Sequence, residues 1–98
     1  MAEQIVHELP APPEAVRHGG QEVLRAFIVE GDLHVSLTNA FERPALWGVL
    51  LVDIARHVAR MYSQEGTALR DQALDEIYRT LQTEWSIPDD DGQTDVIN

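Results

Sequence analysis

Residue types that carry chemistry are sparse in this chain, and the best pair of them lies in one helical segment. Asp53 and His57 are four residues apart, so on a helix they are neighbours on one face. A carboxylate beside an imidazole can act as an acid–base pair or supply two metal ligands. We favour a solvated face with i,i+4 ion pairs such as Asp53–His57, because the two-histidine motif of zinc peptidases is absent.

His34 is the third candidate, and it lies in a segment whose apolar and polar residues alternate as in a strand. If that strand met the helical segment across a dimer axis, His34 and His57 would approach each other. A strand histidine is more often a surface or interface residue. We therefore predict no metal, no cofactor and no catalytic residue. The alternative function is a small-ligand or metal-binding protein that uses Asp53, His57 and His34.

Composition excludes several classes of function. The 98 residues contain 17 acidic and 7 basic side chains, for a formal net charge of −10, and every basic residue is an arginine. Nucleic acids and anionic membrane surfaces attract clustered positive charge, so we expect neither as a partner. Because the chain has no cysteine and no lysine, disulfides, thiol nucleophiles and Schiff-base chemistry are also excluded.

The sequence also predicts neither a membrane span nor a secretory signal. The longest apolar stretch, residues 45–52, is far shorter than the roughly 20 residues that a membrane span needs. Glu3 and Glu8 precede the first arginine, Arg17, which is the wrong order for a secretory signal. We expect a cytoplasmic protein with a single domain.

Breaker residues divide the chain into three ranges. Residues 1–21 form a Pro-containing segment that is mostly irregular, with a short helix starting at Pro13. Residues 22–86 form the globular domain. Residues 87–98 form an acidic tail that we expect to be disordered.

Two β-rich segments, residues 22–30 and 33–39, predict a hairpin with Gly31-Asp32 as its two-residue turn. That turn places Ile28 opposite Val35. The expected core face carries Leu24, Ala26, Ile28, Leu33, Val35 and Leu37. The other face is mixed and carries Arg25, Phe27, Val29, His34, Ser36 and Thr38.

Two amphipathic segments, residues 44–64 and 68–85, predict an antiparallel helix pair with a short connection. The expected core stripe of the second segment carries Ala73, Leu74, Ile77, Leu81 and Trp85. Pro44 suits the first helical position, Gly66 the position past the end, and Thr67 the next N-cap. The expected fold class is α+β, with the hairpin packed against the helix pair. An N-terminal strand or a dimer partner would extend the sheet.

Surplus apolar surface predicts a homodimer. The first half of the 44–64 helix is apolar on nearly every side, and such a helix is usually buried on every side. Both hairpin edges also need a covering. The alternative is that the N-terminal segment covers these groups within one chain. The predicted interaction surface comprises Arg25, Phe27, Val29, His34 and Trp47.

The chain contains four sequence runs that carry a resemblance: Glu8–Pro13, Glu22–Ile28, Leu33–Leu37 and Trp47–Arg60. In these runs it resembles a family of short bacterial proteins classed as a domain of unknown function. The resemblance covers residues 8–85 and implies a bacterial, cytosolic, single-domain protein. It supplies no activity or site residue. We predict a non-enzymatic protein–protein interaction or regulatory module that acts as a homodimer, with a basic protein as the partner of this acidic chain.

Overall fold

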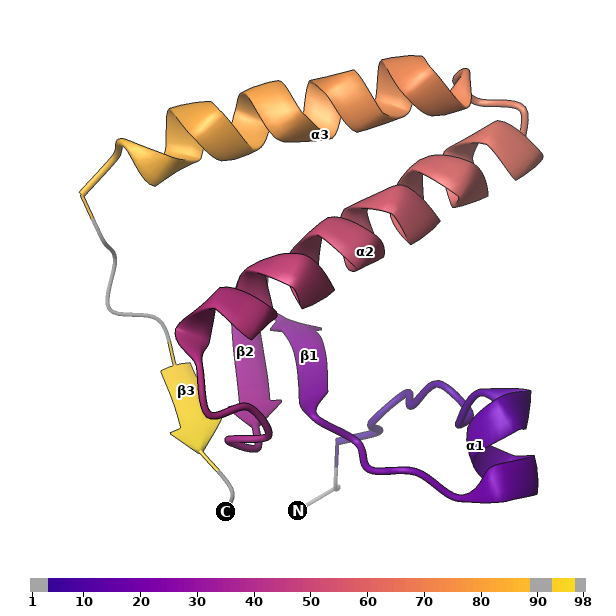
Figure 1. Ribbon diagram of the computed structural model, residues 1–98, viewed down its shortest axis with the longest axis vertical. Coiled ribbons are helices and arrows are strands. Elements are labelled where there is room, and N and C mark those ends of the chain that lie inside the picture. The colour runs from indigo at the N-terminus through magenta and orange to yellow at the C-terminus, as the bar shows by residue number, and fades with distance from the viewer. Residues whose placement is uncertain (1–3, 89–92, 97–98) are drawn as a thin grey trace.

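The computed structural model describes residues 4–88 and 93–96. In this part of the chain the elements follow in the order α1 (Pro13–His18), β1 (Leu24–Val29), β2 (Asp32–Leu37), α2 (Pro44–Gln64), α3 (Arg70–Trp85) and β3 (Gln93–Val96). The fold class is α+β, as the sequence predicts. Figure 1 shows the sheet beside the start of α2, and α2 and α3 as a V that opens away from their connecting turn.

The β1–β2 hairpin is antiparallel, but its register differs from the predicted one. Ile28 pairs with Leu33 instead of Val35. The turn consists of Glu30 and Gly31, with φ of 51° and 85°, as in the type I′ turns that match strand twist. The predicted Gly31-Asp32 turn is therefore wrong. Because the shift is even, each side chain stays on its predicted face of the sheet.

A third strand completes the sheet from the C-terminal end of the chain. β3 pairs with β2 in parallel, so the strand order is β1-β2-β3. Neither an N-terminal strand nor a dimer partner supplies this strand, which corrects the prediction. The expected disordered tail is likewise wrong for residues 93–96, whereas residues 89–92 and 97–98 of that tail lie outside the described residues.

The helix boundaries follow local signals. Pro13 and Pro44 both occupy the first turn of a helix, where a missing N–H costs nothing. Gly66, with φ of 74°, lies just after α2. α3 begins two residues later than predicted, with an extended Leu69 before it and no side-chain cap, so Thr67 does not serve as its N-cap.

Burial in the helix pair falls from the connecting turn towards the open end of the V. Among the described residues only Ala59 of α2 and Ala73 of α3 are buried. Further along α3, Ile77 is half-buried, Leu81 is 48% exposed and Trp85 is 84% exposed. Small side chains let the two helices approach near their connection, while the expected core stripe of α3 opens to solvent at its far end.

The expected core face of the hairpin is open at its turn. Ile28 is 73% and Leu33 is 56% exposed, and Ala26 is exposed as well, so the prediction that this face is buried is wrong for these three residues. In residues 4–88 and 93–96, close Cα approach joins β1 to β2, β2 to β3 and α2 to α3, but no strand to a helix. The helix pair thus leaves this part of the hairpin uncovered in the single chain.

Candidate functional site

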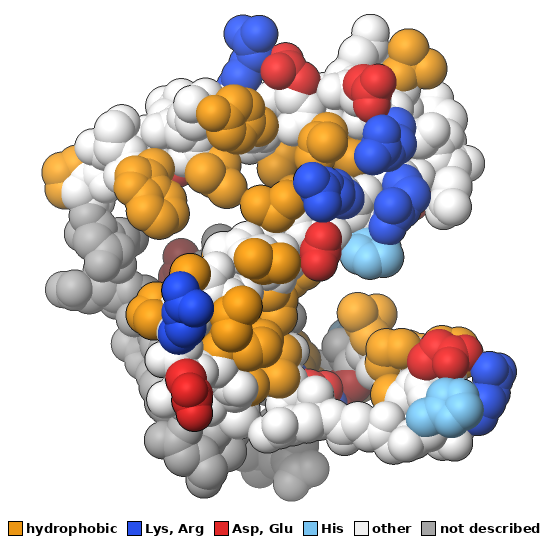
Figure 2. Space-filling model, viewed as in Figure 1, with side chains coloured by type: hydrophobic (Ala, Val, Ile, Leu, Met, Phe, Trp, Pro, Cys, Tyr) orange, Lys and Arg blue, Asp and Glu red, His pale blue; other side chains and the backbone are white. Residues whose placement is uncertain are grey.

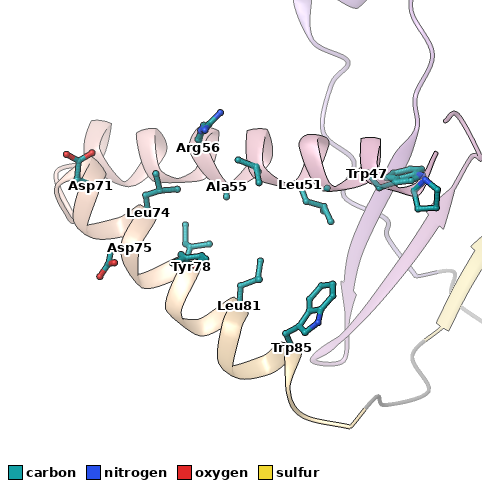
Figure 3. Close-up of a pocket in the computed structure, with 14 residues that line it drawn as sticks. Trp47, Leu51, Ala55, Arg56, Asp71, Leu74, Asp75, Tyr78, Leu81 and Trp85 are labelled. Atoms are coloured by element: carbon teal, nitrogen blue, oxygen red, sulfur yellow. The ribbon is translucent and has the colours of Figure 1, made fainter. Parts of the chain in front are cut away.

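An apolar groove of about 820 Å³ lies between α2 and α3. We call it the interhelical groove. Figure 3 shows Leu51 of α2 and Leu81 and Trp85 of α3 pointing into the space between the helices. Figure 2 shows hydrophobic side chains on both sides of this hollow. The lining comprises Pro44, Trp47, Gly48, Leu51, Val52, Ala55, Arg56, Asp71, Leu74, Asp75, Ile77, Tyr78, Leu81 and Trp85.

Helical periodicity builds both walls of the groove. Trp47, Leu51 and Ala55 recur every four residues and therefore share one face of α2. On α3, Ile77, Leu81 and Trp85 recur at the same spacing. The sequence predicts the apolar stripe of α3 as core, and the structure places every residue of that stripe except Ala73 on the groove wall.

The charged residues of the groove are already engaged. Asp75 accepts a hydrogen bond from Arg79 at 2.8 Å, and Asp71 accepts one from Arg70 at 3.0 Å. Arg56 forms an ion pair with Asp53 at 3.5 Å. The groove therefore presents mainly hydrocarbon and aromatic surface, which suits an apolar binding partner.

An edge-to-face contact holds Trp47 at the start of α2. Its ring centroid lies 5.1 Å from that of Phe41, with an interplanar angle of 80°. This geometry is favourable for aromatic pairs. Trp47 thus has a neighbour in its own chain, whereas Trp85 at the end of α3 is 84% exposed.

The other four residues of the predicted interaction surface lie together on the hairpin. Phe27 pairs directly with His34 across the two strands. The guanidinium of Arg25 lies 6.0 Å from the centre of the Phe27 ring, within reach of a cation–π interaction. Val29 is 48% exposed on the same strand. Trp47 belongs to the interhelical groove, so the structure divides the predicted surface between two elements.

Arg25 also ties the N-terminal segment to β1. Its guanidinium pairs with Glu8 at 2.9 Å and with Glu22. These two carboxylates, Glu8 first, raise the pKa of Arg25 above its ordinary value. The segment nevertheless leaves its own Leu9 90% exposed. The alternative to a dimer is that the N-terminal segment covers apolar surface of its own chain. Leu9 contributes little to such a covering.

The polar face of α2 is organised differently from the predicted Asp53–His57 pair. Asp53 pairs with Arg56, and Arg60 donates a hydrogen bond to His57 Nδ1 at 2.8 Å. His34 lies on β2. In residues 4–88 and 93–96, no group of three or more His, Asp or Glu side chains could hold a metal ion. No helix of this part of the chain is long and apolar enough to cross a membrane.

Comparison with known proteins identifies the family. The model of a family described as a domain of unknown function, DUF5076, matches residues 8–89. The chain belongs to this family. The family assignment confirms the resemblance found in the sequence runs. No curated protein matches this DUF5076 chain.

A solved structure similar to this DUF5076 chain comes from the photosynthetic bacterium Rhodopseudomonas palustrus CGA009, where it is provisionally named a pyruvate dehydrogenase. The two sequences are 43% identical, and the match covers 92% of this chain and 93% of the other. The TM-score of 0.71 shows a shared fold. The arrangement of helices and strands described above is therefore common to both proteins.

Proposed function

We propose that this DUF5076 protein is a non-enzymatic protein–protein interaction module that works in the cytoplasm as a homodimer. The observation that carries the proposal is the excess of exposed surface on the single chain. The exposed side chains include large apolar ones such as Ile28, Leu81 and Trp85, and apolar surface left open in this way is typical of a chain that is completed by another protein.

The excess can be estimated from the size of the chain. A compact protein of 11.0 kDa exposes about 5,600 Å², whereas this chain exposes 9031 Å². The radius of gyration is 15.8 Å, against about 13 Å for a compact chain of this length. The difference in area, about 3,400 Å², exceeds the roughly 800 Å² that each partner contributes to a stable interface.

The small core of the single chain supports the same conclusion. Ala59 and Ala73 are the buried residues of the described structure, and both are small. Ordering a chain costs about 1–2 kcal/mol of conformational entropy per residue, which burial of apolar surface must offset. Association supplies the missing burial.

The hairpin residues Arg25, Phe27, Val29 and His34 are the proposed surface for a second, heterologous partner. They combine an aromatic ring with an exposed aliphatic side chain, a composition found in interface cores. The net charge of −10 favours a basic partner, whose association would be steered by charge and weakened by salt.

The name given to the similar structure supplies a second candidate, pyruvate oxidation. Such an enzyme depends on a bound cofactor that its protein must position. No glycine-rich phosphate loop opens a helix in this sequence. We therefore place the interaction function first. Pyruvate consumption by the purified protein, measured with added thiamine diphosphate and NAD, would reverse that order.

Light scattering coupled to gel filtration tests the dimer. We expect twice the chain mass of 11.0 kDa at micromolar concentration. A mass of one chain at every concentration would overturn the homodimer.

A capture experiment tests the hairpin surface. Tagged protein should retain a basic protein at low salt and lose it at high salt. The Phe27→Asp variant should lose that partner and keep the circular dichroism of the folded chain, whereas the Gln21→Asp control should retain it. Equal capture by Phe27→Asp would remove the hairpin face from the proposal.

A further inference from the structure

We propose that a second copy of this chain occupies the interhelical groove, so that the α2–α3 pairs of two copies face each other across a two-fold axis and form a four-helix bundle. This inference rests on the homodimer of the proposed function and adds the location of its interface. A two-fold interface uses the same patch on both subunits, so the groove must fit itself.

The chemistry of the groove meets that requirement. Both walls carry apolar side chains at helical spacing, with Leu51 on α2 and Leu81 on α3 as examples. Stripes of this kind form the shared core when helix pairs pack into four-helix bundles. A groove with the same apolar character on both walls can therefore pack against an identical groove.

The shape of the helix pair indicates where the second copy lies. Small side chains, Ala59 and Ala73, are buried near the connection, where the helices already pack against each other. Large side chains, Trp47 and Trp85, line the groove towards the open end of the V (Figure 3). Two such wedges placed open end to open end bring the large side chains of both copies into one core.

Charge permits this approach even though each copy carries a net charge of −10. The acidic residues of the groove, Asp71 and Asp75, belong to the first turns of α3, and both pair with arginine. The outer part of the groove is lined by Trp47, Leu51, Leu81 and Trp85 and carries no charge. The repulsion between two acidic chains therefore does not concentrate at the proposed contact.

The extent of apolar exposure favours a second copy over a small ligand. A groove of about 820 Å³ could admit a small molecule. Large apolar side chains stay exposed along the whole groove, however: those of Leu51, Val52, Tyr78, Leu81 and Trp85 are between 48% and 84% exposed. A small molecule would leave part of this length in water, whereas the helix pair of a second copy is long enough to cover it.

Tryptophan fluorescence tests the location directly. The chain has two tryptophans, and both line the groove, so its emission reports on this surface alone. We expect blue-shifted emission and weak acrylamide quenching in the dimer. Dilution should bring a red shift and stronger quenching over the same concentrations at which light scattering records dissociation.

A matched pair of variants completes the test. Leu81→Glu puts a carboxylate into the groove and should raise the dimer dissociation constant by about 100-fold or more, because an unpaired buried charge is strongly disfavoured. Thr83→Glu places the same charge on the same helix outside the groove lining and should leave dissociation unchanged. Circular dichroism of both variants monitors folding. The fluorescence quenching experiment uses the unaltered protein and therefore tests the interface even if a variant fails to fold.

The outcomes separate this inference from the proposed function. A dimer whose tryptophans are quenched as strongly as in the monomer would overturn the groove interface and leave the homodimer standing. Burial of Trp47 and Trp85 in a protein that scatters light as a monomer would overturn the groove interface and the homodimer together. Such a result would show that something other than a second copy occupies the groove.

Discussion

Trp47 of α2 and Trp85 of α3 line the same apolar groove from its two walls, although they lie far apart in the chain (Figure 3). Trp47 contacts Phe41 edge to face, while Trp85 is 84% exposed. The chain itself therefore supplies an aromatic neighbour for Trp47 but leaves most of Trp85 exposed. Trp85 depends more on a second molecule for burial, which makes it the more sensitive probe of association.

Enlarging Ala59 should destabilise the fold where α2 and α3 meet. Ala59 has no exposed surface, so Ala59→Leu forces extra methyl groups into a packed contact. We expect the free energy of unfolding to fall by about 1–3 kcal/mol in urea titrations at fixed protein concentration. Ala45→Leu, exposed at the start of the same helix, is the control. Equal stability of Ala59→Leu and the unaltered protein would show that the helices do not pack tightly here.

Removing the Arg25 guanidinium should release the N-terminal segment. Arg25→Gln loses the pairs with Glu8 and Glu22, so cleavage after Glu8 by a glutamate-specific protease should become faster. Global stability should change little because the pairs are exposed. Arg17→Gln, which loses only a local pair with Glu14, should leave the cleavage rate unchanged.

Alkaline pH should not release this segment. The carboxylates raise the pKa of Arg25 above its ordinary value, so its pairing contributes throughout the neutral and mildly alkaline range and is lost only as pH rises past the raised pKa. The rate of cleavage after Glu8 in the unaltered protein, relative to that of an unstructured peptide, should therefore stay constant from neutral to mildly alkaline pH. A relative rate that rises over this range would contradict the pairing as the anchor.

The hairpin turn offers a route to higher stability. Glu30 has a φ of 51°, a left-handed conformation that asparagine tolerates better than glutamate. Glu30→Asn creates the Asn-Gly pair preferred in type I′ turns and should raise the free energy of unfolding by about 0.5–1 kcal/mol. Glu30→Ala removes the same charge without favouring this conformation and should bring no gain. A gain of equal size in both variants would assign the effect to charge.

Truncation should expose the outer edge of β2. β3 pairs in parallel with β2, from His34 opposite Gln93 to Leu37 opposite Val96. Deletion of residues 93–98 leaves the β2 groups that face β3 without partners, so hydrogen exchange of those amides should accelerate while the β1–β2 bonds stay protected. Deletion of residues 97–98 alone is the control. Unchanged exchange after the longer deletion would show that β3 does not protect β2 in solution.

Local signals determined most of the elements. Pro44 at a first helical position and Gly66 after a helix end mark α2 in the sequence, and the structure gives α2 these same limits. Alternation over residues 33–37 likewise predicted a strand. The predicted faces of the hairpin also held, because the error in the turn was an even shift. These features depend on residues a few positions apart, which a sequence displays directly.

The tertiary structure alone decided which surfaces meet. β3 is hidden in the sequence by the charged run before it, and its pairing with β2 joins segments far apart in the chain. The apolar stripe of α3 reads as core, yet Leu81 and Trp85 lie on an open groove because α2 diverges from them. Periodicity shows that a side chain is in an apolar stripe but not which neighbour buries it. The neighbour is decided by long-range packing, and in the single chain the side chains of Leu81 and Trp85 stay exposed.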